Sequence, residues 1–271
     1  MKKQVLCAAL GLALALTACA GEPGGPGAST PAPESAPAVS PTPAPESASP
    51  SPAAEAGGLM RVNGGSREAF AAALERLLQE HILPDGTDVG LLEGYDMADN
   101  RFAVCDVDGD GERELILIYE STIVAGIRTF VYSWDGATGE VGVQLEAHTS
   151  NPVFYESGAV QSPALHNQQL ISRDFWPYTL YRYDKYLDVY LEVGSVHAWG
   201  REALENGYPE EADKSGTGFV YYIAANGGDS DEPLDASVYQ AWRYVYVRDS
   251  QEIQPEYLAL TEENIQSILA G

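Results

Sequence analysis

The acidic segment 106–115, with the sequence DVDGDGEREL, constrains the fold more than any other part of this 271-residue chain. On either side lie two short apolar runs, 101–105 and 115–119, which are rich in strand-forming residues. Such flanks predict that the acidic segment joins two β-strands rather than two helices. Gly111 stands at the position where a loop that curls around an ion turns sharply, and a Cβ there would be unfavourable.

The carboxylates of this segment predict a calcium site. Acidic side chains at alternate positions of a curled loop point inward, and calcium prefers about six to eight oxygen ligands. Without a cation, the five carboxylates repel one another, and only Arg113 opposes them. A structural ion is favoured over a catalytic one, because the ligands are needed to close the cage. The alternative is an acidic turn that binds nothing. The predicted metal-binding residues are Asp106, Asp108, Asp110, Glu112 (through its backbone carbonyl) and Glu114.

The segment differs from an EF-hand. That motif requires a glutamate at the last loop position, where this chain has Leu117. The pattern D-x-D-x-D-G-x-x-E-L between strands instead resembles the calcium loops of FG-GAP and VCBS-type repeats. That resemblance implies that Asp106, Asp108, Asp110 and Glu114 are the side-chain ligands. It covers a single copy of the loop, so it implies no propeller fold.

The N-terminus has the features of an export signal. Lys2 and Lys3 precede an apolar run, 5–16, that is too short to span a bilayer. The sequence LTAC that ends at Cys19 resembles the lipobox of bacterial lipoproteins. That resemblance implies that residues 1–18 are a lipoprotein signal peptide and that Cys19 is lipidated. The chain would then be anchored to the extracytoplasmic face of the bacterial cell membrane. The alternative is an ordinary secretory signal that is cleaved without lipidation.

Composition divides the rest of the chain into a linker and one domain. Residues 19–58 are dominated by Pro, Ala, Ser, Gly and Glu and contain no aromatic residue, so they cannot bury enough apolar surface to fold. They are predicted to be a disordered linker that begins at the lipidated cysteine. Residues 59–271 contain every Trp, Tyr and Phe of the chain and are predicted to form one calcium-binding globular domain.

The net charge of −25 argues against two classes of partner. Nucleic acid binds to basic protein surfaces, and an acidic domain is repelled by anionic lipid. Cys105 is the one cysteine outside the N-terminal segment, so no intrachain disulfide is expected. We expect the side chain of Cys105 to be a small buried apolar group. Separately, we expect the protein to be a monomer.

The hydrophobic pattern predicts an α+β fold. An N-terminal helix is expected to be capped by Ser66 and to run to about residue 83, before Pro84. Two C-terminal helices are expected, one over 236–247 and a last one capped by Thr261. Between them we expect one antiparallel sheet of about seven to nine strands. The expected strands are 101–105, 115–119, 128–134, 140–146, a hairpin around 156–158, 178–183, 189–199 and 219–223.

Familiar catalytic motifs are absent from the sequence. The four histidines have no H-E-x-x-H spacing, and neither a G-x-S-x-G motif nor a Gly-rich phosphate loop occurs. No catalytic residue is therefore predicted. Aromatic residues gather in one predicted hairpin region, which suits the binding of glycans or peptides but is also common in β-sheets. These residues are Trp176, Tyr178, Tyr181, Tyr183, Tyr186 and Tyr190.

Two functions stay open from the sequence. The first is a non-enzymatic binding module, stabilised by calcium, for a glycan, a peptide or a surface protein. The second is an extracytoplasmic hydrolase of cell-wall or host glycans, which needs two carboxyl groups about 5–9.5 Å apart. The lipobox, the linker, the acidic loop and the stretches 175–184 and 260–264 together resemble surface lipoproteins of Gram-positive anaerobes, which implies location and calcium but no activity. A second acidic patch, 229–235, is a candidate for a further ion.

Overall fold

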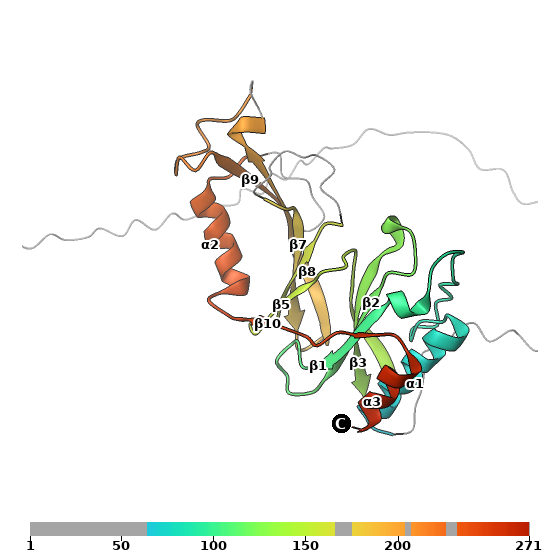
Figure 1. The fold of residues 1–271 in the computed structure, drawn as a ribbon. Helices are drawn as coiled ribbons and strands as arrows, with labels where there is room; N and C mark the ends of the chain where they lie inside the picture. Colours follow the sequence, from blue (N-terminus) through green and yellow to red (C-terminus); the bar gives the residue numbers. More distant parts are fainter. Residues whose placement is uncertain (1–63, 166–174, 204–206, 226–231, 271) are drawn as a thin grey trace, which may run out of the picture. The chain divides into compact units, whose positions relative to one another are not determined.

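The acidic segment lies in a β-hairpin of the computed structural model. Its two strands are β1 (Arg101–Cys105) and β2 (Glu114–Tyr119), which pair antiparallel with Phe102 opposite Leu117. The prediction that the segment joins two strands is therefore confirmed. The described part of the chain has an α+β fold, with two antiparallel sheets and three α-helices (Figure 1). The structure describes residues 64–165, 175–203, 207–225 and 232–270.

A five-stranded sheet continues from this hairpin in the order β11-β1-β2-β3-β4. Strands β3 (Arg128–Asp135) and β4 (Glu140–Ala147) follow on one side, and β11 (Leu258–Ala259) pairs with β1 on the other. All six residues of β2 are buried. Because successive side chains of a strand point to opposite faces, both faces of this sheet must be covered at β2.

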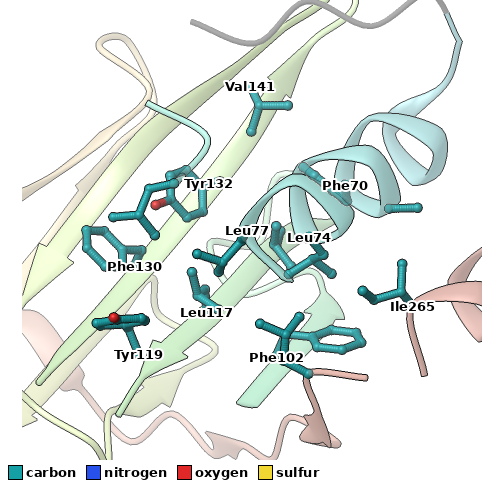
Figure 2. Packing of buried hydrophobic residues seen from close by; sticks show 14 of the residues in the cluster. Phe70, Leu74, Leu77, Phe102, Leu117, Tyr119, Phe130, Tyr132, Val141 and Ile265 are labelled. Carbon is teal, nitrogen blue, oxygen red and sulfur yellow. The ribbon is translucent and has the colours of Figure 1, made fainter. Parts of the chain in front are cut away.

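Helices α1 (Ser66–Glu80) and α3 (Glu262–Ala270) cover one face of this sheet. The apolar residues of α1 recur every three or four positions, so they form one stripe that packs onto the strands. Each fully buried side chain of this size contributes about 1.5–3 kcal/mol to stability. Residues of this core include Phe70, Leu74, Leu77, Phe102, Leu117, Phe130, Tyr132 and Ile265 (Figure 2).

The ends of α1 differ slightly from the prediction. Its N-cap is Gly65 rather than Ser66, and the backbone N–H of Gly65 donates to the carboxylate of Glu68 at 3.0 Å. The helix stops at Glu80, because His81 adopts a left-handed conformation with φ of 60°. The predicted end near residue 83 is therefore a few residues too late. The other two helices agree closely with their predicted positions, 236–247 and after Thr261.

A second antiparallel sheet has the order β10-β5-β6-β7-β8-β9. Helix α2 (Ala236–Val247) packs against its last strand, where the rings of Tyr221 and Tyr239 stack 4.1 Å apart. The hairpins predicted around 156–158 and over 178–199 are both present in this sheet. Its strands are β5 (Val153–Tyr155), β6 (Ala159–Pro163), β7 (Tyr178–Asp184), β8 (Val189–Gly200), β9 (Phe219–Ala224) and β10 (Glu252–Ile253).

The prediction of one antiparallel sheet is wrong, because the strands of the described residues divide into sheets of five and six. The second face of the first sheet is apolar, so another layer must cover it. Ile116 and Val131 on that face pack with Phe154 and Val160 of the second sheet, in a core separate from the one under the helices. In a single sheet this face would have no cover. The two-residue strands β10 and β11 escaped prediction because they are too short to show a periodic pattern.

Candidate metal centre

The loop between β1 and β2 wraps around the carboxylate of Asp106. One oxygen accepts the backbone N–H of Gly109 at 2.7 Å, and the other accepts that of Gly111 at 3.1 Å. Both glycines have positive φ, 81° and 95°, which side-chain-bearing residues rarely adopt. The sharp turn predicted at Gly111 is therefore present, and it directs backbone N–H groups toward the first aspartate of the motif.

Glu114 closes the loop from the first position of β2. Its side chain is only 1% exposed, and it accepts the backbone N–H of Val107 at 2.8 Å. The pKa of this carboxyl group is raised to about 8, chiefly by burial. The hydrogen bond from Val107 opposes the rise, and the nearby charges of Asp108, Asp110 and Asp106 contribute to it. A carboxylate in this position is stable only when a positive charge compensates it or when it is protonated.

Asp108 is the second buried carboxylate of the loop. Asp108 is 7% exposed. One of its carboxylate oxygens accepts the backbone N–H of Asp110 at 3.0 Å, and the other accepts a hydrogen bond from Nε2 of Gln144 at 3.2 Å. Burial raises its pKa to about 6. The Oε1 atom of Gln144 is buried as well and has no hydrogen-bond partner among the described residues. The side-chain hydrogen-bond donor to the Asp108 carboxylate is therefore the neutral amide of Gln144.

The second sheet reaches the loop through Asp188, in the turn between β7 and β8. Its Oδ1 accepts Nε2 of Gln144 at 2.5 Å and the hydroxyl of Tyr183 at 2.8 Å, and its Oδ2 accepts the hydroxyl of Ser133 at 2.9 Å. Gln144 therefore bridges the acidic loop and the second sheet. Sequence reasoning missed both Gln144 and Asp188, because neither stands in a motif and only the fold brings them to the loop.

Three carboxylates of the loop meet at one point. Oxygen atoms of Asp106, Asp108 and Glu114 all lie within 4.8 Å of one another. Each offers a hard, negatively charged oxygen, and two of the three residues are buried. Such a group can hold a metal ion that prefers oxygen ligands.

The two remaining predicted ligands lie outside this group. Asp110 and Glu112 are exposed, and the carboxylate of Asp110 accepts the backbone N–H of Glu112 at 2.8 Å. The structure therefore brings together the carboxylates of three of the four predicted side-chain ligands. Asp110 and Glu112 lie next to them on the loop with exposed side chains, and the ligand predicted at Glu112 is its backbone carbonyl.

Two other predicted sites, the lipidation site and the second acidic patch, lie wholly or partly outside the described residues. Cys19 and the acidic residues 229–231 lie outside the part of the chain that the structure describes. Asp235, at the end of the second acidic patch, is the N-cap of α2 and accepts the backbone N–H groups of Ser215 at 2.7 Å and Ser237 at 3.0 Å. Hydrogen bonds from these two serines lower its pKa. This aspartate therefore has a structural role.

The aromatic residues of the predicted hairpin region do not form one binding face. Tyr178 and Tyr190 are buried, whereas Trp176 is 50% exposed and Tyr186 is 87% exposed. The indole N–H of Trp176 donates to the carbonyl of Ala164 at 2.6 Å. Packing of the second sheet accounts for the buried members of the group.

Cys105 is half-buried, so the expectation of a buried side chain is only partly met. Burial raises the pKa of its thiol to about 11, and the carboxylates of Glu114 and Asp106 add to the shift. The thiolate form is therefore disfavoured at neutral pH, which argues against a nucleophilic role.

Comparison of the chain with protein-family models, with curated proteins and with solved structures gave no match. Among the helices of the described residues, none is long and apolar enough to cross a membrane.

Proposed function

We propose that this chain is a calcium-binding surface lipoprotein, anchored to the extracytoplasmic face of the cell membrane, whose folded domain, 59–271, is a non-enzymatic binding module. The observation that carries the calcium assignment is the group of oxygens from Asp106, Asp108 and Glu114. Burial of two of these carboxylates is unfavourable unless a cation is bound. Titration of the wild-type chain and of Asp108→Asn with calcium tests this assignment.

The donor set favours calcium over other metals. The three clustered groups are all carboxylates, whereas zinc and copper sites in proteins typically include His or Cys among their ligands. Magnesium keeps several waters and demands a strict octahedron, while calcium accepts many oxygens in an adaptable loop. We assign Asp110 and the backbone carbonyl of Glu112 as further ligands from their positions in the motif. The likeness of the loop to those of FG-GAP and VCBS-type repeats supports the same set.

A binding role fits the sequence better than hydrolysis. A glycoside hydrolase of the alternative kind needs two carboxyl groups about 5–9.5 Å apart in a cleft. The clustered carboxylates accept backbone N–H groups of their own loop, which suits a structural ion. The absence of familiar catalytic motifs from the whole sequence points the same way.

The proposed location depends on the lipobox-like sequence at Cys19. The Cys19→Ser variant should leave the membrane fraction, because a thioether-linked lipid cannot form on serine and the rest of the anchor is lost. Cell fractionation and immunoblotting of the wild-type and variant chains measure this. The half-buried Cys105→Ser is the matched control and should stay with the membrane. A Cys19→Ser chain that also remains in the membrane fraction would contradict the lipid anchor.

A further inference from the structure

An open groove of about 480 Å³ lies along the outer edge of β1. That volume is within the range of about 300–1,000 Å³ that is typical of small-ligand sites. Its lining residues include Val104 of β1, Arg67 of α1, Ile268 of α3 and Pro255 of the segment that joins β10 to β11. Strand β1 and helices α1 and α3 are seen in Figure 1. Arg113, from the acidic loop, lies at the same groove.

Beyond Phe102, the backbone of β1 has no strand partner on the side that faces this groove. Pairing with β11 covers only Arg101 and Phe102. The N–H of Leu260 donates to the carbonyl of Asn100 at 2.9 Å, so the carbonyl of Asn100 points to this edge. Backbone groups of alternate residues in an antiparallel strand point the same way. The N–H and C=O of Val104 therefore point to the same edge, beyond the end of β11, and such an unpaired edge is a template for an added extended peptide.

The charge of the groove differs from that of the chain. Arg67 and Arg113 both line it, and neither forms an ion pair with a described carboxylate, in contrast to Arg76, which pairs with Glu80 at 3.4 Å. Glu256 is the one carboxylate among its described lining residues. Two unpaired guanidinium groups in a chain with a net charge of −25 favour an anionic ligand. A guanidinium group fits a carboxylate in a two-point geometry.

We propose that this groove binds short peptides in an extended conformation. The peptide backbone pairs with Val104, and the C-terminal carboxylate is held by Arg67 and Arg113. The inference rests on the proposed function, because it names the partner of the binding module and the face that receives it. A neutral glycan would leave both arginines without a counter-charge, so the groove favours a peptide acid.

An array of tetrapeptides immobilised through their N-termini tests this proposal. Each sequence is present in two forms, one with a free C-terminal carboxylate and one with a C-terminal amide, and the full chain is applied in about 1 mM calcium. A subset of free-acid peptides should retain the chain about tenfold more than their amidated twins, because charge-assisted contacts are lost in the amide. The double variant Arg67→Gln/Arg113→Gln should lose that difference. Arg76→Gln, which removes one positive charge outside the groove, should keep it.

Three results would overturn the peptide groove: no retention of the wild-type chain, equal retention by acid and amide forms, or full retention of the double variant. The double variant should remain folded, since no described carboxylate forms an ion pair with either arginine. It should bind calcium at least as tightly as the wild type does, because Arg113→Gln removes the one positive charge of the acidic loop. Loss of peptide discrimination with intact calcium binding thus identifies the groove. A wild-type chain that selects peptide acids without binding calcium would overturn the metal assignment alone.

Discussion

Calcium-free protein should lose stability as the pH rises from about 5 to about 8, by about 3–5 kcal/mol. The cause is the pair of buried carboxyl groups in the acidic loop. Burial raises the pKa of Glu114 to about 8 and that of Asp108 to about 6. The folded chain therefore holds protons that the unfolded chain has already released. Urea unfolding in EDTA at a series of pH values measures the effect.

The sign of this dependence follows from the raised pKa values. The folded state is stabilised relative to the unfolded state when the carboxyl group of Glu114 is protonated, so this contribution is fully present below its ordinary pKa of 4.5. It is lost as the pH rises through the folded pKa of about 8. The carboxyl group of Asp108 adds a smaller loss of stability as the pH rises from 3.8 to about 6. With calcium bound, the ion compensates both charges, so stability should depend less steeply on pH.

Substitution of Glu114 should separate this effect from other titrations. Glu114→Gln keeps an acceptor for the backbone N–H of Val107 but cannot ionise, so most of the pH dependence in EDTA should disappear. Glu112→Gln is the matched control, because that side chain is exposed and its substitution should leave the slope unchanged. A wild-type profile that is flat in EDTA from pH 5 to 8, or a slope unchanged by Glu114→Gln, would contradict the electrostatic account of the loop.

Calcium should raise the melting temperature of the wild-type chain. Extracellular calcium modules often bind at about 0.1–1 mM. With about 1 mM free calcium and a dissociation constant of about 0.1 mM, binding adds about 1.4 kcal/mol, which corresponds to about 3–6 °C for a domain of this size. Scanning calorimetry in calcium and in EDTA measures the difference.

Asp108→Asn should abolish most of this shift, because it removes a charged ligand while keeping the shape of the side chain. Glu112→Gln should retain the shift, since its assigned ligand is the backbone carbonyl, which the substitution leaves in place. Helix α2, which packs on the second sheet, should keep its structure in EDTA, as measured by amide hydrogen exchange. Wild-type melting curves that coincide in calcium and EDTA would rule out calcium stabilisation.

Local sequence patterns predict much of this fold. The apolar runs on either side of the acidic segment form β1 and β2, and the helix predicted over 236–247 is α2, Ala236–Val247. These elements carry their own signals: apolar residues at a helical or strand period, bounded by turn residues or a capping aspartate. The core of the candidate metal site is predictable for the same reason, because Asp106, Asp108 and Glu114 lie on one continuous loop.

Long-range arrangement is what the sequence does not reveal. The division into two sheets depends on which face of β2 each neighbour covers, and no local period encodes that choice. Gln144 and Asp188 reach Asp108 from separate strands and turns, so their role appears only once the two sheets pack. The groove beside Val104 exists because β11 is only two residues long and ends early, a length too short for any pattern to predict.

Titration of the wild-type chain and of Asp108→Asn with calcium at pH 7, followed by isothermal calorimetry, tests the central claim most directly. We predict that the wild type binds one calcium ion at the loop with a dissociation constant of about 0.1–1 mM. Asp108→Asn should show no measurable binding over the same range. A wild-type chain that binds no calcium, or an Asp108→Asn chain that binds it equally well, would contradict the assignment of the acidic loop as a calcium site.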